Sequence, residues 1–146
     1  MRIHFMNDKV RKIYKNNGGV KTADSVGFDL CTIEDIEVKK DTTGLIELGV
    51  IIKPEDGFFT AVYPRSSTHR KYGLIQANSV GIIDPDYCGE NDYIKFPYLA
   101  LRGCKIPAGT AIAQAIQIIK LPFSISEFDP QRKSRGGFGS TDKEAK

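Results

Sequence analysis

Hydrophobic and polar residues alternate with a period of two along much of this chain. Between Gly44 and Ile52 the even-numbered positions are all apolar or glycine, and Thr110–Lys120 places Ile112, Gln114 and two further isoleucines on one face and alanines on the other. Alternation of this kind is typical of half-buried strands. Further strands are predicted at Arg2–Met6, Val26–Thr32, Phe58–Tyr63, Leu74–Ile83, Tyr93–Phe96 and Ser124–Phe128.

Turn signals separate these strands, while helix signals are scarce. Glycine-, proline- and asparagine-containing turns occur at residues 16–19, 54–57, 88–91 and 107–109. No segment sustains helical periodicity over ten residues, and the only helix predicted is a short one at Ser67–Tyr72, which Gly73 would end. Many short strands with frequent turns are typical of a sandwich, jelly roll or barrel. We therefore expect an all-β fold.

Length and composition predict one domain with an appended arm. A chain of 146 residues fits one domain. After Phe128 the composition becomes polar, charged and glycine-rich, and Phe138 is the only large apolar residue that follows. We expect a β-domain over residues 1–128 and a flexible C-terminal arm over residues 129–146.

Charge and cysteine content exclude several classes of protein. The net charge is +3 and the isoelectric point is about 8.7, whereas nucleic-acid-binding domains more often exceed about 9 with a basic face. Small basic groups such as Arg65–Lys71 suit a single polyanionic ligand better than a nucleic acid. Three cysteines without a C-x-x-C pair favour a reducing compartment. No signal peptide or apolar run of about 20 residues is seen, so we expect a soluble, cytoplasmic protein without a membrane partner.

Pro64–Thr68 is the first candidate for ligand chemistry. Arg65, Ser66 and Ser67 lie where a predicted strand meets the short helix. Amides of a first helical turn lack internal partners, so two hydroxyls and a guanidinium there can bind an oxyanion. A capping serine beside an exposed arginine explains the same residues.

The segment Asn78–Tyr87 is the second candidate. Asp84 follows an apolar run and precedes Pro85, so its carboxylate is held where a strand leaves the core and can orient a water and accept its proton. An Asx-turn acceptor is an equally good interpretation of Asp84. Asn78 can read a base edge or cap a turn. Gln114, on the isoleucine face of its strand, needs a partner, which can be a ligand, a neighbouring subunit or a backbone carbonyl.

The segment Arg135–Thr141 is the most specific of the three. Its glycines let successive amides converge on an anion, and Arg135 adds a bidentate phosphate contact. A disordered tail would explain the glycines but not Phe138, which makes sense if the arm folds over a flat ring.

Taken together and in this order, these segments resemble the five motifs of the trimeric dUTPase family. The resemblance extends from about Ala23 to Thr141, and the chain departs from the common pattern at Ser67, Ala111 and Asp142 and in the spacing before Gly136. The matching segments are Gly27–Leu30, Pro64–Ser67, Asn78–Gly89, Gly109–Gln114 and Arg135–Thr141.

This resemblance implies a fold, an assembly and an activity. The fold would be a distorted β-barrel of jelly-roll type, and the assembly a homotrimer in which the C-terminal arm closes over a neighbour's active site. The activity would be Mg²⁺-dependent hydrolysis of dUTP to dUMP and pyrophosphate, which limits uracil incorporation into DNA and supplies dUMP for thymidylate synthesis.

The resemblance also implies roles for single residues. Asp84 would hold the attacking water, Asp29 would reach Mg²⁺ through water, and Phe138 would cap the base. Tyr87 would pack under the deoxyribose. The substrate-binding residues expected in this way are Arg65, Ser66, Ser67, Asn78, Gly81, Ile83, Tyr87, Asp92, Tyr93, Gln114, Arg135, Phe138, Gly139 and Ser140.

Two other functions fit parts of the same sequence. A dCTP deaminase of this fold has an Arg-Ser-Ser segment like Arg65–Ser67, and Glu90 is available as its glutamate, but such enzymes lack the Arg-Gly-Gly-Phe-Gly-Ser arm. A binding module that uses the nucleotide to switch a partner protein is the third possibility, and intact motifs are compatible with it.

Overall fold

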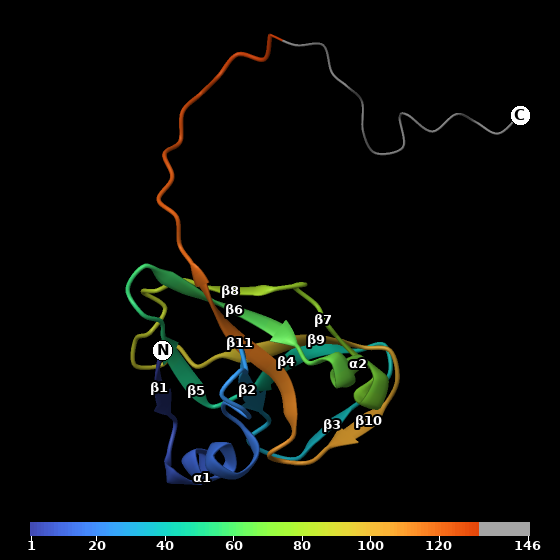
Figure 1. The fold of residues 1–146 in the computed structure, drawn as a ribbon. Coiled ribbons are helices and arrows are strands. Elements are labelled where there is room, and N and C mark those ends of the chain that lie inside the picture. Colours follow the sequence, from blue (N-terminus) through green and yellow to red (C-terminus); the bar gives the residue numbers. More distant parts are fainter. Residues whose placement is uncertain (132–146) are drawn as a thin grey trace, which may run out of the picture.

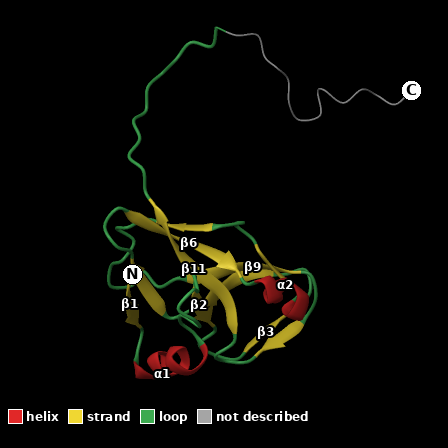
Figure 2. Cartoon of the chain, viewed as in Figure 1, coloured by secondary structure: helices red, strands yellow, loops and turns green. Residues whose placement is uncertain are grey.

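A computed structural model describes residues 1–131, which form a β-rich fold with two helices (Figures 1 and 2). The fold class predicted from the sequence is confirmed as mostly β. The elements, in chain order, are β1 (Arg2–Phe5), α1 (Asp8–Asn17), β2 (Phe28–Cys31), β3 (Ile36–Val38), β4 (Thr43–Glu47), β5 (Val50–Lys53), β6 (Phe58–Pro64), α2 (Ser66–Tyr72), β7 (Leu74–Gln76), β8 (Gly81–Ile83), β9 (Lys95–Ala100), β10 (Cys104–Ile106) and β11 (Ala111–Ile119).

The strands pair in antiparallel fashion in four hydrogen-bonded groups rather than in one continuous barrel. The largest group has the order β2-β11-β6-β8, and the next has the order β4-β9-β7. Two smaller groups are β1 with β5 and β10 with β3. Most neighbours are distant in sequence, so these sheets bring widely separated segments side by side (Figure 1).

Strand β11 is the element that gathers the predicted motifs. It lies between β2 and β6, and its Gln114 is opposite Asp29 on one side and Tyr63 on the other. Strand β6 ends at Pro64 and leads directly into α2. The predicted segments Gly27–Leu30, Pro64–Ser67 and Gly109–Gln114 therefore lie next to one another around β11.

The core confirms the alternation seen in the sequence. Ile46, Leu48, Val50 and Ile52 are buried and Leu45 is exposed, although in β5 the intervening Ile51 is buried as well. On β11, Ile112 is buried on one face, and the alanines at 113 and 115 are fully buried on the other. Burial of each large aliphatic side chain contributes about 1.5–3 kcal/mol, so this alternation is the main stabilising pattern of the fold.

The prediction that no ten-residue helix exists is wrong, because α1 spans Asp8–Asn17. Its apolar residues are few but correctly spaced: Val10 and Tyr14 are four residues apart and both are buried. Asn7 caps the helix by accepting a hydrogen bond from the Val10 amide at 3.0 Å. This short amphipathic pattern was not recognised in the sequence because lysines and arginines surround the two buried residues.

Two predicted strands are each divided by a turn. The run Gly44–Ile52 is β4 followed by β5, because Gly49 adopts a left-handed backbone with φ of 65°. A Cβ at Gly49 would lie 2.9 Å from Ile33, so the close packing also needs glycine. The run Leu74–Ile83 is β7 followed by β8, and Ser79, with φ of 61°, lies in the turn between them.

The remaining differences concern very short strands and the bounds of one longer strand. Strands β3 and β10 were not predicted, since each has only three residues and too short an alternation to recognise. The strand expected near Tyr93–Phe96 begins at Lys95 and continues to Ala100.

Ser124–Phe128, which was predicted to be a strand, is not one in the structure. It belongs to an exposed segment that runs away from the body after β11 (Figure 1). No helix within residues 1–131 has the length and apolar character needed to cross a membrane.

Candidate active site

The first cavity, which we term the β8 cleft, has a volume of about 300 Å³ and lies beside strand β8. Six residues predicted to bind or act on the substrate meet there: Asn78, Gly81, Ile83, Asp84, Tyr87 and Tyr93. The rest of its wall is formed by Leu45, Val62, Gln76, Ile82, Ile94, Lys95 and Pro97. One cavity thus gathers all five predicted residues of the segment Asn78–Gly89, together with Tyr93.

Pairing of β8 with β6 sets the shape of this cleft. Gly81 lies opposite Val62, and Ile83 lies opposite Thr60. A Cβ at Gly81 would come within 3.2 Å of the Val62 Cβ and within 3.7 Å of Asn78 Nδ2. Glycine at this position therefore lets β8 pack closely against Val62 of β6, and Asn78 lies beside it at ordinary contact distance.

Asp84 lies just after β8 with an exposed side chain. Its backbone carbonyl accepts a hydrogen bond from the Tyr87 amide at 3.1 Å, which closes a turn with Pro85 at its second position. Among residues 1–131, no hydrogen bond or ion pair involves the Asp84 carboxylate. The turn is thus made by backbone atoms, and the carboxylate is left available to a ligand or water.

Asp92 has a structural contact near the cleft. Its Oδ2 accepts a hydrogen bond from the Gly89 amide at 2.7 Å and so holds the turn that follows Tyr87. Asp92 is not among the residues lining the cleft, and its contact with the substrate stays a prediction.

Lys95 lines the cleft and was missed by sequence reasoning. Its Nζ lies 2.7 Å from Glu47 Oε1, and the two residues are directly opposite on β9 and β4. The hydrogen bond to Glu47 raises the pKa of Lys95 above its usual value. The Lys95 cation is therefore balanced by a neighbouring carboxylate.

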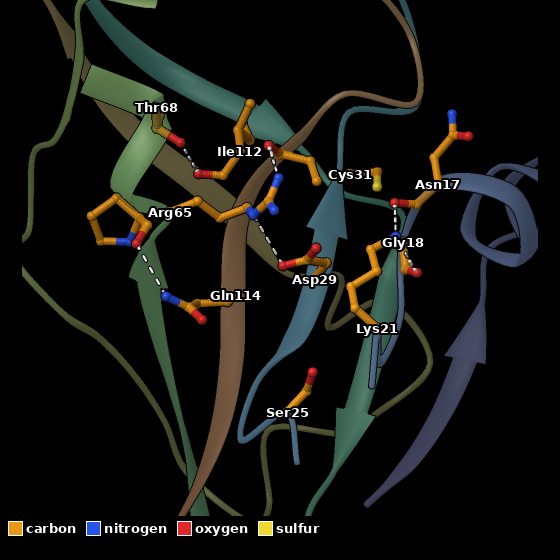
Figure 3. A network of polar contacts seen from close by, with 12 residues as sticks. Asn17, Gly18, Lys21, Ser25, Asp29, Cys31, Arg65, Thr68, Ile112 and Gln114 are labelled. Carbon is orange, nitrogen blue, oxygen red and sulfur yellow. Dashed lines mark hydrogen bonds and ion pairs between the residues drawn. The ribbon is translucent and has the colours of Figure 1, made fainter. Parts of the chain in front are cut away.

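The second cavity, which we term the Arg65 pocket, has a volume of about 280 Å³ and is lined by polar and charged residues (Figure 3). It includes four of the predicted residues: Asp29, Arg65, Ser66 and Gln114. The others are Lys21, Ser25, Val26 and Gly27. Ser67, one residue further into α2, is not among them.

Arg65 connects three elements at this pocket. Its Nε lies 3.1 Å from Asp29 Oδ1 on β2, and its Nη1 donates to the Ala111 carbonyl on β11 at 3.3 Å. Arg65 also forms the N-terminal boundary of α2, and Thr68 ties that helix to the Ile112 carbonyl at 2.6 Å. A guanidinium has five N–H donors, so donors remain for an anionic ligand.

Gln114 projects into the same pocket beside a glycine. Its Nε2 donates weakly to the Pro64 carbonyl at 3.5 Å, and a Cβ at Gly27 would lie only 2.7 Å from its Oε1. Glycine at position 27 therefore leaves room for the Gln114 side chain in its present position. Of the alternatives left open for Gln114, a backbone carbonyl supplies one partner, and its Oε1 still lines the pocket.

Lys21 adds a second positive charge that sequence reasoning did not single out. Its Nζ donates to the carbonyls of Asn17 and Gly18 at 2.5 and 3.0 Å, after the end of α1 (Figure 3). Only the course of the chain after α1 brings this lysine to Arg65. Because α1 was not predicted from the sequence, the position of Lys21 at the Arg65 pocket could not be predicted either.

Cys31, on the same strand as Asp29, is a buried thiol. Burial is the main cause that raises its pKa to about 11; the charges of Lys21 and Arg65 act in the opposite direction. Cys31 is therefore a small residue of the core.

The β8 cleft and the Arg65 pocket have no lining residue in common. Strand β8 is at one edge of the four-stranded sheet, and β2 is at the other. The predicted arm residues Arg135, Phe138, Gly139 and Ser140 lie outside the described residues.

The chain is similar to known proteins over the region that contains the five predicted motifs. The sequence model of the dUTPase family matches residues 16–142, which include all five predicted motifs. The chain belongs to the dUTPase family. The family resemblance inferred from the five segments is confirmed.

Individual relatives agree in sequence and in fold. The SPbeta prophage-derived deoxyuridine 5'-triphosphate nucleotidohydrolase of Bacillus subtilis is 44% identical over 116 residues, which are 78% of this chain and 82% of that protein. The dUTPase from Streptococcus mutans superposes with a TM-score of 0.75 at 26% identity, over 85% of this chain and 99% of that one. A mutant dUTPase from phage phi11 of Staphylococcus aureus, described as coordinating a structural Mg(II) ion, has the same fold, with a TM-score of 0.74 at 13% identity over 89% of this chain and 97% of that one.

Asp29 is the residue expected to contact Mg²⁺ through water, so its surroundings show whether the site fits a metal ion. Within the described part of the chain, no group of three or more histidine, cysteine or acidic side chains could hold a metal ion directly. Asp29 is 7% exposed, its Oδ1 pairs with Arg65, and its Oδ2 is buried without a partner among these residues. A lone carboxylate with one free acceptor fits contact through a metal-bound water rather than direct coordination.

Proposed function

We propose that this chain hydrolyses dUTP to dUMP and pyrophosphate at sites that form between the protomers of a homotrimer. The observation that carries the proposal is the gathering of the motif residues into two cavities of opposite character in a chain of the dUTPase family. The homologues from Bacillus subtilis and Streptococcus mutans, named for action on dUTP or as dUTPase, support the same substrate.

The β8 cleft is the proposed site for the deoxyuridine. Its walls are mainly apolar, which suits a flat base and a sugar without a 2′-hydroxyl. Asn78, Gly81, Ile83, Tyr93 and the neighbouring turn would contact uracil. Tyr87, 42% exposed at the cleft, would pack under the deoxyribose.

The Arg65 pocket is the proposed site for the phosphates. Arg65 and Lys21 supply positive charge, and Ser66 and Gln114 supply hydrogen-bond donors. Such groups, fixed before the substrate arrives, stabilise the charge that spreads over the phosphoryl oxygens in the transition state. Ser67, Arg135 and Ser140 would complete the phosphate contacts.

Asp84 is the proposed general base. Its carboxylate would orient a water and accept its proton while the water oxygen attacks the α-phosphorus. The bond from the α-phosphorus to the bridging oxygen breaks as the new bond forms, and pyrophosphate leaves with that oxygen. The free carboxylate of Asp84 at the cleft supports this role.

Mg²⁺ is the proposed cofactor, and Asp29 would hold it through water. When bound, the ion neutralises charge on the triphosphate that supplies its direct ligands. The unpartnered Oδ2 of Asp29 can accept a hydrogen bond from a water of the ion's shell. Asp29 also keeps the Arg65 guanidinium in place through their ion pair.

A trimeric assembly would unite the two cavities. They lie at opposite edges of one sheet, so a complete site can combine the β8 cleft of one protomer with the Arg65 pocket of the next. The segment after β11 also exposes Leu121, Phe123, Ile125 and Phe128 by 74–89%. Exposed apolar residues of this number indicate a surface that another chain covers.

The arm over residues 129–146 would close over a neighbour's nucleotide. Phe138 would stack on the base, while Gly139 and its neighbours would offer amides to the phosphates. Closure would exclude bulk water during the reaction. In a cytoplasmic setting the activity would limit uracil incorporation into DNA and supply dUMP.

A pyrophosphate-release assay across dUTP, dCTP, dTTP and UTP tests the proposal. We expect rapid release from dUTP and at least about 100-fold lower kcat/KM for the others. Release of ammonia from dCTP would identify a deaminase instead. Tight dUTP binding without turnover, together with a partner protein that dUTP displaces, would identify a nucleotide-switched binding module.

A further inference from the structure

Gln76 is a buried polar residue of the β8 cleft to which neither the sequence motifs nor the proposed mechanism gives a role. It ends strand β7, is 4% exposed and lines the cleft beside Asn78. Its Nε2 donates two hydrogen bonds of 3.0 Å, one to the Val62 carbonyl and one to Asn78 Oδ1. A buried amide with both donors used in this way sets the geometry of its neighbours.

The direction of these hydrogen bonds is fixed by the backbone. The Val62 carbonyl on β6 can only accept, so the nitrogen of the Gln76 amide, and not its oxygen, must face it. The second hydrogen of that nitrogen then meets the oxygen of the Asn78 amide. Rotation of Asn78 by half a turn would bring two N–H groups together, so its oxygen is held toward Gln76.

The consequence is that Asn78 offers donors rather than an acceptor to the cleft. Its oxygen is held toward Gln76, and Nδ2 lies on the side of Gly81, where a Cβ would be 3.7 Å away. Uracil carries a carbonyl oxygen at C4, whereas cytosine carries an amino group there. A fixed N–H donor therefore matches uracil and opposes cytosine.

Gln76 itself provides a second, independent indication of a ligand. Its Oε1 is buried and has no hydrogen-bond partner among the described residues. An unsatisfied buried acceptor costs about 1–3 kcal/mol, so a donor from a ligand or an ordered water is expected at this position.

We propose that Gln76 is a positioning residue for base selection. Its amide nitrogen is held by the Val62 carbonyl and in turn holds the Asn78 oxygen, so that the Asn78 amide presents its N–H groups to uracil. The inference rests on the proposed function, since it assigns the base to the β8 cleft. It goes beyond that function because Gln76 acts through Asn78 and determines which base is rejected.

The test compares kcat/KM for dUTP and for dCTP in Gln76→Leu, in Asn78→Ala and in the double variant. Gln76→Leu should lower the value for dUTP about 10-fold, mainly through KM, and change the value for dCTP less than about 2-fold. In the Asn78→Ala background, Gln76→Leu should cause no further change in the dUTP-to-dCTP ratio, because the two residues act in series.

Thr60→Val is the matched control. Thr60 is fully buried on β6, two residues from Val62, and its hydroxyl is also unpartnered among the described residues. This variant should leave the ratio unchanged. If Gln76→Leu does not fold, Gln76→Met, which keeps the length of the side chain, should lower the ratio in the same way.

The inference would be overturned if the dUTP-to-dCTP ratio of kcat/KM were unchanged in folded Gln76→Leu or Gln76→Met. It would also be overturned if Gln76→Leu lowered that ratio as much in the Asn78→Ala background as it does in the wild type. Wild-type protein that fails to hydrolyse dUTP would instead refute the proposed function. The two failures are therefore distinguished by the wild-type assay alone.

Discussion

The β8 cleft and the Arg65 pocket are built on opposite physical principles. The cleft has mainly apolar walls and few polar groups, and its amides are aligned by hydrogen bonds such as Gln76 to Val62 at 3.0 Å. The pocket is lined by charges from separate elements, joined by the ion pair between Arg65 and Asp29 at 3.1 Å. The cleft can select a base by hydrogen-bond direction, and the pocket can hold phosphates by charge.

This difference predicts that the two regions respond differently to substitution. Changes in the cleft should alter discrimination between bases, whereas changes in the pocket should weaken all triphosphates equally. Asp84 is the exception, because it lies in the cleft and yet would act on the phosphate.

The largest effect is expected for Asp84→Asn. Removal of a general base should lower kcat for dUTP about 10²–10⁴-fold, while dUTP binding changes little because the substitution keeps the size and polarity of the side chain. Pyrophosphate release measures the first quantity, and titration calorimetry with dUTP measures the second. Turnover within a factor of about three of wild type would refute the assignment.

The next largest effect is expected for the double variant Asp29→Asn/Arg65→Gln. Changing both partners avoids a buried unpaired charge, so the fold should be kept. We expect kcat/KM to fall about 10²-fold for dUTP and for dCTP alike, since charge near the phosphates is lost and the cleft is untouched. A change in the dUTP-to-dCTP ratio of more than about 3-fold would contradict the separation of the two regions.

The smallest effect concerns stability at alkaline pH and is confined to the side of the Arg65 pocket. Cys31 and Tyr14 are both buried, the Tyr14 hydroxyl is hydrogen-bonded to the backbone of Cys31, and burial raises the pKa of each side chain, for Cys31 to about 11 from 9.0. As the pH rises, the Cys31 thiol ionises in the unfolded chain before it ionises in the folded protein. Its contribution to the free energy of unfolding is therefore fully present below pH 9 and falls by about 1 kcal/mol per pH unit as the pH rises toward 11.

Urea unfolding between pH 8 and pH 10.5 measures this loss. The variant Cys31→Ala should show a shallower decline above pH 9, because only the tyrosine then contributes. Identical slopes for the variant and the wild type would show that the Cys31 thiol is not the titrating group.

Much of this organisation could be predicted from the sequence, because alternation and motif order are local properties. The alternation around Ile46 and Ile112 identified the main core strands, and six of the predicted residues line one cavity. Helix α1 was missed since its buried face consists of little more than Val10 and Tyr14.

The features that were missed depend on contacts between distant segments. Lys21 reaches the Arg65 pocket only because α1 turns the chain toward β2. The role of Gln76 depends on the Val62 carbonyl, fourteen residues earlier on another strand. Direction of a hydrogen bond is not a property of a sequence motif, so neither residue could be recognised from the sequence.

The most direct test of the account is to mix two variants that are each strongly impaired. Asp84→Asn has an intact Arg65 pocket, and Asp29→Asn/Arg65→Gln has an intact β8 cleft. If each active site takes these cavities from different protomers, unfolding and refolding an equimolar mixture should restore about one quarter of wild-type pyrophosphate release from dUTP, because one pairing in four is intact on both sides. Activity that stays at the mean of the two separate variants would contradict a site shared between protomers.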